Sequence, residues 1–196
     1  MSEAKPEPEV LVVADRAAWR AWLDANEDAS DGVWLVLVKK NKSGATALAY
    51  VEAVEEALCS GWIDGQMKSI DDAVVRQRFT PRRRRSIWSL RNVERVERLI
   101  AEGRMRPRGH AEIAAAKADG RWDRAYGGDT LKQVPADLAA AFAAEPAAAE
   151  TFAQLNGQNR YAVLHRVTTA NSDTTRAKRI ERLVGMLARG ETPYPQ

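Results

Sequence analysis

The sequence predicts an α+β protein, with a small N-terminal α+β sandwich followed by a C-terminal helical bundle. Short β-branched runs alternate with helical patterns in the first 80 residues, which favours a mixed or antiparallel sheet of about four strands. From residue 86 onward the pattern is helical almost throughout. A Gly-Gly loop separates the two parts. The expected regions are a disordered leader (1–8), an α+β domain (9–125), a linker (126–134) and a helical domain (135–196).

The N-terminal part is predicted to run strand, helix, strand, helix, strand, strand. Asp15 precedes the first helical pattern, where an aspartate caps free backbone N–H groups. Gly61 follows the second helical pattern, and glycine is common just after a helix. The apolar run "VWLVLV" indicates a central strand that is buried on both faces. The expected elements are strands at 9–14, 33–40, 62–70 and 73–79, and helices at 16–26 and 49–60.

The remainder is predicted to be helical. The first of these helices is expected to begin at Ser86 as its cap, directly after a run of arginines. Pro135 and Pro146 mark two helix starts, because proline is favoured in the first turn. The expected helices span 86–103 and 109–120, start at Pro135 and Pro146, and cover roughly 158–170 and 172–189.

Charge is strongly segregated along the chain, although the net charge is only +3. Residues 76–108 contain 12 arginines and three glutamates, a local charge of +9. Residues 156–189 contain seven basic and two acidic residues, a local charge of +5, so the rest of the chain carries −11. A positive face of this kind attracts anions, and salt screens that attraction.

Composition disfavours several classes of protein. The single cysteine, Cys59, cannot form an internal disulfide or a zinc site built from several thiolates, and it fits a reducing cytoplasm. No apolar run approaches the ~20 residues of a membrane-spanning helix, and the leader lacks the features of a secretory signal. His110 and His165 lie in separate helical regions without a nucleophile or metal motif. We therefore expect no cofactor, no metal and a cytoplasmic location.

The most specific candidate site lies between residues 61 and 89. Arg76 and Arg78 alternate on a predicted strand, so both project from one sheet face. Four arginines then precede a helix start, where free N–H groups and the helix dipole favour anions. A guanidinium pairs with phosphate or carboxylate through two hydrogen bonds. The predicted anion-binding residues are Arg76, Arg78, Arg82, Arg83, Arg84, Arg85 and the adjacent Trp88; the alternative is a solvated basic turn with weak surface pairs.

Two further groups of residues carry candidate chemistry. Trp62 and Asp64 alternate on a strand, so an indole and a carboxylate would face one ligand; alternatively Trp62 packs in the core and Asp64 pairs with an arginine. The last helix carries a secondary basic patch, which either makes contacts within the bundle or faces a second anion. This patch consists of Arg176, Arg179 and Arg182.

These segments resemble a known family. "YVEAVEEALCSGWIDGQMKSID", "RFTPRRRRSIWSLRNVERVERLIAEGRM" and "AKADGRWDRAY" look like the N-terminal part of YdeI/OmpD-associated (bacteriocin-protection) proteins. The tail from "VPADLAAAFAAEPAAAETFAQL" to "TTRAKRIERLV" is similar to that family's small helical C-terminal domain, so the resemblance covers about residues 33–190. It implies a link to protection against cationic peptides and to an outer-membrane porin, and it supplies no catalytic residues. The lack of an export signal sets this chain apart from the porin link.

We therefore expect a non-enzymatic protein of the stress- or bacteriocin-protection type. Its partner would be an anionic small molecule or an acidic protein surface, bound through the Arg-rich site. Nucleic-acid binding through the same patch is the first alternative, although no helix-turn-helix or RNP-type signature occurs. An enzyme that uses Asp64 as a base is the second alternative. The sequence leaves the oligomeric state open.

Overall fold

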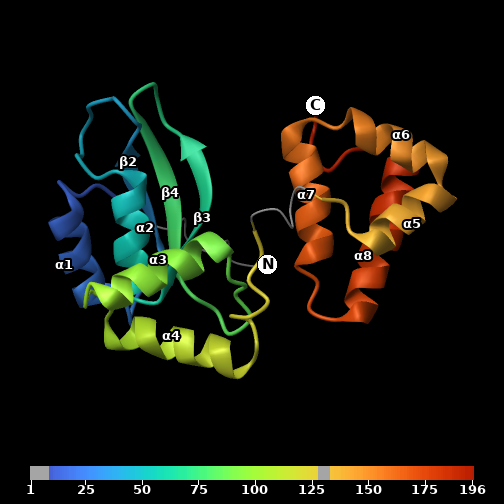
Figure 1. Cartoon of the computed structure of the whole chain (residues 1–196). Helices are drawn as coiled ribbons and strands as arrows, with labels where there is room; N and C mark the ends of the chain where they lie inside the picture. The colour runs from blue at the N-terminus through green and yellow to red at the C-terminus, as the bar shows by residue number, and fades with distance from the viewer. Residues whose placement is uncertain (1–8, 128–132) are drawn as a thin grey trace, which may run out of the picture. The chain divides into compact units, whose positions relative to one another are not determined.

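The computed structural model of the chain describes residues 9–127 and 133–196 (Figure 1). The chain divides into two compact units: unit 1 comprises residues 1–124 and unit 2 comprises residues 125–196. The expected leader at 1–8, and residues 128–132 of the expected linker, lie outside the described residues.

Unit 1 is built on a four-stranded mixed sheet, which confirms the predicted α+β class. β1 is parallel to β2, whereas β4 is antiparallel to both of its neighbours, and the strand order is β1-β2-β4-β3. The elements of unit 1 are β1 (Val10–Leu11), α1 (Arg16–Asn26), β2 (Val33–Val38), α2 (Tyr50–Cys59), β3 (Trp62–Ser69), β4 (Val74–Pro81), α3 (Leu90–Ala101) and α4 (Pro107–Ala118).

The core of unit 1 lies between the sheet and α1 and α2. Val33, Leu35 and Leu37 on β2 are fully buried and point to one face, because alternate residues of a strand point the same way. On that face Phe79 of β4, paired with Val33, contacts Trp19 of α1 at 5.5 Å between ring centroids. The helices α3 and α4 contact α2. The intervening residues of β2 therefore point away from α1 and α2.

The connection between β4 and α3 differs from the expectation. α3 begins at Leu90 with Ser89 as its cap, and the Ser89 hydroxyl accepts from the Asn92 N–H at 3.2 Å. Ser86, the expected cap, instead accepts from the Arg83 N–H at 2.9 Å within a turn. The prediction of a helix start at Ser86 is therefore wrong, and the arginine run does not adjoin the helix N-terminus. Ser86 and Ser89 are three residues apart, and either could cap a helix. Ser86 forms part of the turn, and Ser89 caps α3.

Unit 2 is a bundle of four helices, in agreement with the predicted helical C-terminal part. Its core is formed by apolar residues of all four helices, including Leu138, Phe152, Val163 and Leu183. No helix in the described parts of the chain is long and apolar enough to span a membrane. The helices of unit 2 are α5 (Ala136–Ala144), α6 (Pro146–Gln154), α7 (Gly157–Thr168) and α8 (Asp173–Ala188).

Candidate functional site

Positive side chains gather around Trp34 on the sheet face that points away from α1 and α2. Trp34 pairs with Arg78 of β4, and Arg76 pairs with Lys68 of β3, so all four residues share this face. The Lys68 ammonium lies 5.2 Å and the Arg76 guanidinium 5.1 Å from the centroid of the Trp34 ring. Both distances fit a cation–π interaction. We call this group (Trp34, Lys68, Arg76 and Arg78) the cation face.

The cations of this face have few partners. Lys68 is exposed and Arg76 is half-buried, and neither forms an ion pair with another described residue. Arg78 is half-buried, and its Nη2 donates to the Asp31 carbonyl oxygen at a long 3.4 Å. Its buried Nη1 has no hydrogen-bond partner among the described residues. Burial lowers the pKa of Arg78, and the Asp31 charge opposes this shift. Lys68 and Arg76 therefore carry positive charge without an ion-pair partner among the described residues.

Arg82 and Trp88 belong to a different, buried contact. The Arg82 guanidinium carbon lies 3.5 Å from the centroid of the Trp88 ring, and Trp88 is only 2% exposed. Trp122 covers the same indole, with 4.9 Å between the ring centroids. The indole that was expected to stack on a ligand thus packs against Arg82 and Trp122, which leaves it little surface for a ligand.

Arg83, Arg84 and Arg85 form an exposed turn after β4. None of the three makes an ion pair with a described residue. β4 continues three residues beyond Arg78 and five beyond Arg76, to Pro81, so the turn begins roughly 10 Å along the strand from the nearest member of the cation face. The predicted arginines therefore fall into three groups: the cation face, the buried Arg82 and the exposed turn.

Trp62 and Asp64 enter a polar contact beside α2. Trp62 is fully buried, and its indole N–H donates to the Glu27 carbonyl oxygen at 3.2 Å. The Asp64 carboxylate accepts from the Tyr50 hydroxyl at 2.7 Å. Burial and the Asp64 carboxylate together raise the pKa of Tyr50, against the opposing charges of two arginines in α3. Asp64 is thus paired with a phenol, and Trp62 is part of the core.

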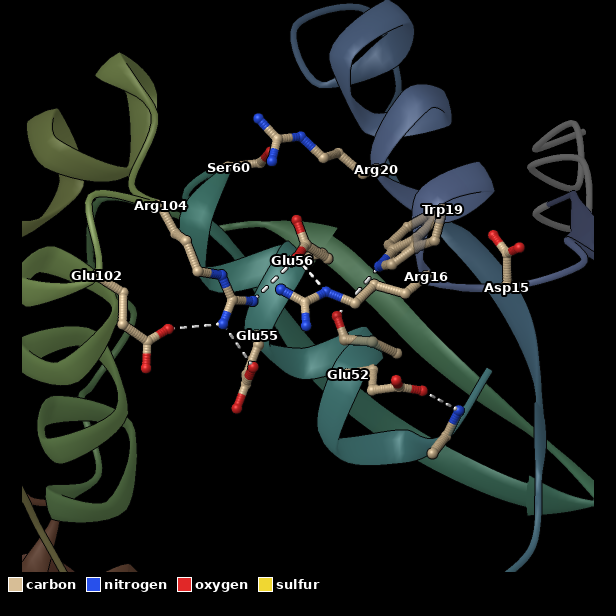
Figure 2. Close-up of polar contacts among 12 residues, drawn as sticks. Asp15, Arg16, Trp19, Arg20, Glu52, Glu55, Glu56, Ser60, Glu102 and Arg104 are labelled. Atoms are coloured by element: carbon tan, nitrogen blue, oxygen red, sulfur yellow. Dashed lines mark hydrogen bonds and ion pairs between the residues drawn. The ribbon is translucent and has the colours of Figure 1, made fainter. Parts of the chain in front are cut away.

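Sequence reasoning missed a buried acidic pair on α2. Glu56 is 2% exposed, and its carboxylate lies 2.7 Å from Arg16, 3.0 Å from Arg104 and 3.1 Å from Arg106. Glu55 pairs with Arg98 and, at 3.0 Å, with Arg104. Figure 2 shows Arg16 and Arg104 reaching Glu56 from opposite sides. The neighbouring pairs are Arg104 with Glu102, Arg106 with Asp24, and Arg108 with Asp28.

This network neutralises much of the local +9 charge that the sequence displays. Burial by itself would raise the pKa of Glu56, but hydrogen bonds from Arg16 and Arg104 and the charge of Arg106 hold the pKa below its usual value. A signal was present in the sequence, because two adjacent glutamates interrupt an otherwise apolar helix stretch at 53–59. Carboxylates at such positions need cationic partners.

The secondary basic patch is used mainly inside unit 2. Arg176 forms a two-pronged contact with Asp137, at 2.6 and 2.8 Å, and also donates to the Val167 carbonyl oxygen. Arg179 donates to the Arg166 carbonyl oxygen at 2.7 Å, at the C-terminal end of α7. Arg182 is exposed and forms no ion pair with a described residue.

Two family models match the chain. Residues 11–112, more than half of the chain, match "Domain of unknown function (DUF8412)". Residues 133–190 match "Bacteriocin-protection, YdeI or OmpD-Associated", so this match is narrower than the expected 33–190. At the level of that family the match indicates a bacteriocin-protection type of role. Neither a curated protein nor a solved structure matches the chain. The chain therefore belongs to the DUF8412 family, whose model matches residues 11–112, and its residues 133–190 match the model of the bacteriocin-protection, YdeI or OmpD-associated family.

Proposed function

We propose that unit 1 binds a multiply charged anionic ligand on the cation face, and that this binding is its contribution to a role of the bacteriocin-protection type. The single observation that carries the proposal is the placement of Lys68 and Arg76, each about 5 Å from one indole and without a carboxylate partner among the described residues.

The contrast with the other arginines of unit 1 supports this location. Arg104 and Arg106 are mostly buried and are compensated by glutamate or aspartate. On the cation face the same residue type lacks such compensation among the described residues. Clustered like charges repel one another, so an anion that bridges them relieves that repulsion. The unpaired charges of Lys68 and Arg76 therefore lie on the side of the sheet that points away from α1 and α2.

The indole contributes by holding the cations in place. A guanidinium that lies over a ring keeps its N–H groups available for hydrogen bonds. The ring also holds the side chain in place before binding, so less rotamer freedom is lost when a ligand binds. Arg78 adds a buried N–H group without a described acceptor, and an acidic oxygen would satisfy it. This combination favours phosphate or carboxylate groups that are held by two or more cations.

Calorimetric titration of the full chain with inorganic tripolyphosphate tests the proposal. We expect saturable binding that weakens between about 20 and about 200 mM NaCl, because salt screens exposed charge. The double variant Lys68→Ala, Arg76→Ala should weaken binding by at least about tenfold, since two charge-assisted contacts are removed.

A matched control is available in the exposed turn. Arg83→Ala, Arg84→Ala removes the same two charges at a position remote from Trp34, and we expect it to change the affinity by less than about twofold. If this control abolishes binding while Lys68→Ala, Arg76→Ala does not, the site lies at the turn and the cation-face proposal is wrong. Equal, small losses in both variants would indicate unspecific attraction and would also reject the proposal.

A further inference from the structure

Unit 2 carries the most exposed aromatic side chains of the chain, and both lie beside cationic groups. Tyr161 is 48% exposed and Tyr194 is 43% exposed, whereas every other aromatic residue is buried or half-buried. Tyr161 lies on α7, and Tyr194 follows α8, where its backbone N–H donates to Asn159 of α7. Exposed rings that are not needed for a core are available for stacking.

The rings around His165 form an ordered cluster. Tyr161, one turn earlier on α7, stacks on His165 with 5.4 Å between the ring centroids and an interplanar angle of 21°. Tyr126 meets the imidazole edge-on, at 4.7 Å and 84°. The imidazole therefore fixes the orientation of Tyr161, while nearly half of the Tyr161 side chain stays open to a further flat ring.

Positive charge surrounds this cluster. Burial and the charges of Arg179 and Arg166 lower the pKa of His165, and no carboxylate acts on it in the opposite direction. The Arg166 guanidinium also lies 5.8 Å from the centroid of the Tyr194 ring. Neither arginine forms an ion pair with a described residue. Arg166 and Arg179 thus lie near the His165 ring, and Arg166 also lies near Tyr194.

We infer that the surface of unit 2 around Tyr161 and Arg166 binds single-stranded nucleic acid, with an unpaired base stacked on Tyr161 and phosphates held by the arginines. The residues of this surface are Tyr126, Tyr161, His165, Arg166, Arg179 and Tyr194. Aromatic platforms interleaved with positive side chains are the usual means of holding a single strand without reading its sequence. This site lies in unit 2, so it is independent of the anion site proposed for unit 1.

Fluorescence anisotropy with a labelled oligo-uridine strand tests the inference. We expect a complex whose affinity falls steeply with salt, because phosphate-bound counterions are released. Tyr161→Ala should weaken binding by about tenfold, whereas Tyr161→Phe keeps the ring and should stay within about twofold of the wild type. Arg166→Ala should reduce the salt dependence, while Arg84→Ala in unit 1 removes an equal charge and should leave it unchanged.

A second measurement does not depend on any variant. The chain has only two histidines, His110 in unit 1 and His165 in unit 2, so their imidazole signals are readily separated by NMR. The strand should shift the His165 signal and leave that of His110 in place. Uridine monophosphate, titrated in parallel, separates recognition of a strand from recognition of a free nucleotide. Absence of a complex at low salt, an unmoved His165 signal in the complex, or equal affinities of Tyr161→Ala and wild type would overturn the inference.

Discussion

Replacing Glu56 by glutamine removes one buried negative charge and leaves the surrounding guanidinium groups in place. The wild-type carboxylate contacts Arg16, Arg104 and Arg106, and Arg106 is itself only 8% exposed. Glutamine has nearly the same size, so packing is retained and the change is electrostatic. The amide still accepts hydrogen bonds from one guanidinium, but it compensates none of the three charges.

The expected cost follows from this geometry. Removal of one partner from a buried ion pair lowers the free energy of unfolding by about 3–5 kcal/mol. Because glutamine keeps a hydrogen-bond acceptor, we expect a loss of about 3 kcal/mol. Against a total free energy of unfolding of about 5–15 kcal/mol, this is a large fraction. For a unit of this size the melting temperature should fall by roughly 10 °C.

The unfolding of unit 1 can be followed separately from that of unit 2. All six tryptophans lie at or before Trp122, within unit 1, so indole fluorescence during urea or thermal unfolding reports on unit 1. The pKa of Glu56 is held below its usual value, so its stabilisation is present above the usual carboxyl pKa of 4.5 and disappears as the pH falls through the lower value of the folded state. The difference between variant and wild type should therefore be largest near neutral pH and shrink in acid.

Glu102→Gln is the matched control. Glu102 also contacts Arg98 and Arg104, at 2.8 and 2.9 Å, but it lies on the surface, where water and salt screen ion pairs and leave them a small effect on stability. If Glu56→Gln costs no more than Glu102→Gln, or if its cost is the same at acidic and neutral pH, the buried carboxylate does not stabilise unit 1 in the way described.

Three further outcomes follow from local geometry. Gly109→Ala should destabilise unit 1 by about 1–3 kcal/mol, because the added Cβ would overlap the Cys59 carbonyl. Gly185→Ala in α8 has room for the added Cβ and should be neutral or stabilising. Urea unfolding measures both changes. Burial raises the pKa of the Cys59 thiol to about 11, so a thiol reagent at mildly alkaline pH should react only as fast as unit 1 opens, and rapid reaction of the folded chain would contradict this. Burial and Asp64 raise the pKa of Tyr50, so in a spectrophotometric titration Asp64→Asn should lower the pH at which Tyr50 ionises; an unchanged titration curve would exclude the Asp64 effect.

The layout of strands and helices could be predicted because it depends on local periodicity. The run 33–37 is buried throughout, as its apolar pattern predicts, and β2 lies between two other strands. The final helix buries Ile180, Leu183 and Leu187 at the predicted spacing. The start of α3 could not be predicted in this way. The Arg82 N–H donates to the Gly61 carbonyl oxygen, and this tertiary contact fixes the turn before the helix.

The candidate site was only partly predictable, for a related reason. The period of a strand places Arg76 and Arg78 on one face, and the register agrees. Which arginines are neutralised depends on partners far away in sequence. Arg16 and Arg106 are separated from Glu56 by 40 and 50 residues, and no local pattern indicates that they meet. A segment charge of +9 therefore overstates the positive surface.

The two sets of arginines in unit 1 lie apart, so the stability of unit 1 and the proposed anion binding depend on different residues. The arginines around Glu56 act on stability, whereas Lys68 and Arg76 contact an indole on the opposite side of the sheet and share no carboxylate with them. Stability and anion binding should therefore respond to different substitutions. Lys68→Ala, Arg76→Ala should lose tripolyphosphate while indole fluorescence shows unfolding at nearly the wild-type urea concentration. Glu56→Gln, measured where it is still folded, should keep the ligand. If the two sets of charges formed one network, each variant would change both the free energy of unfolding and the affinity for tripolyphosphate.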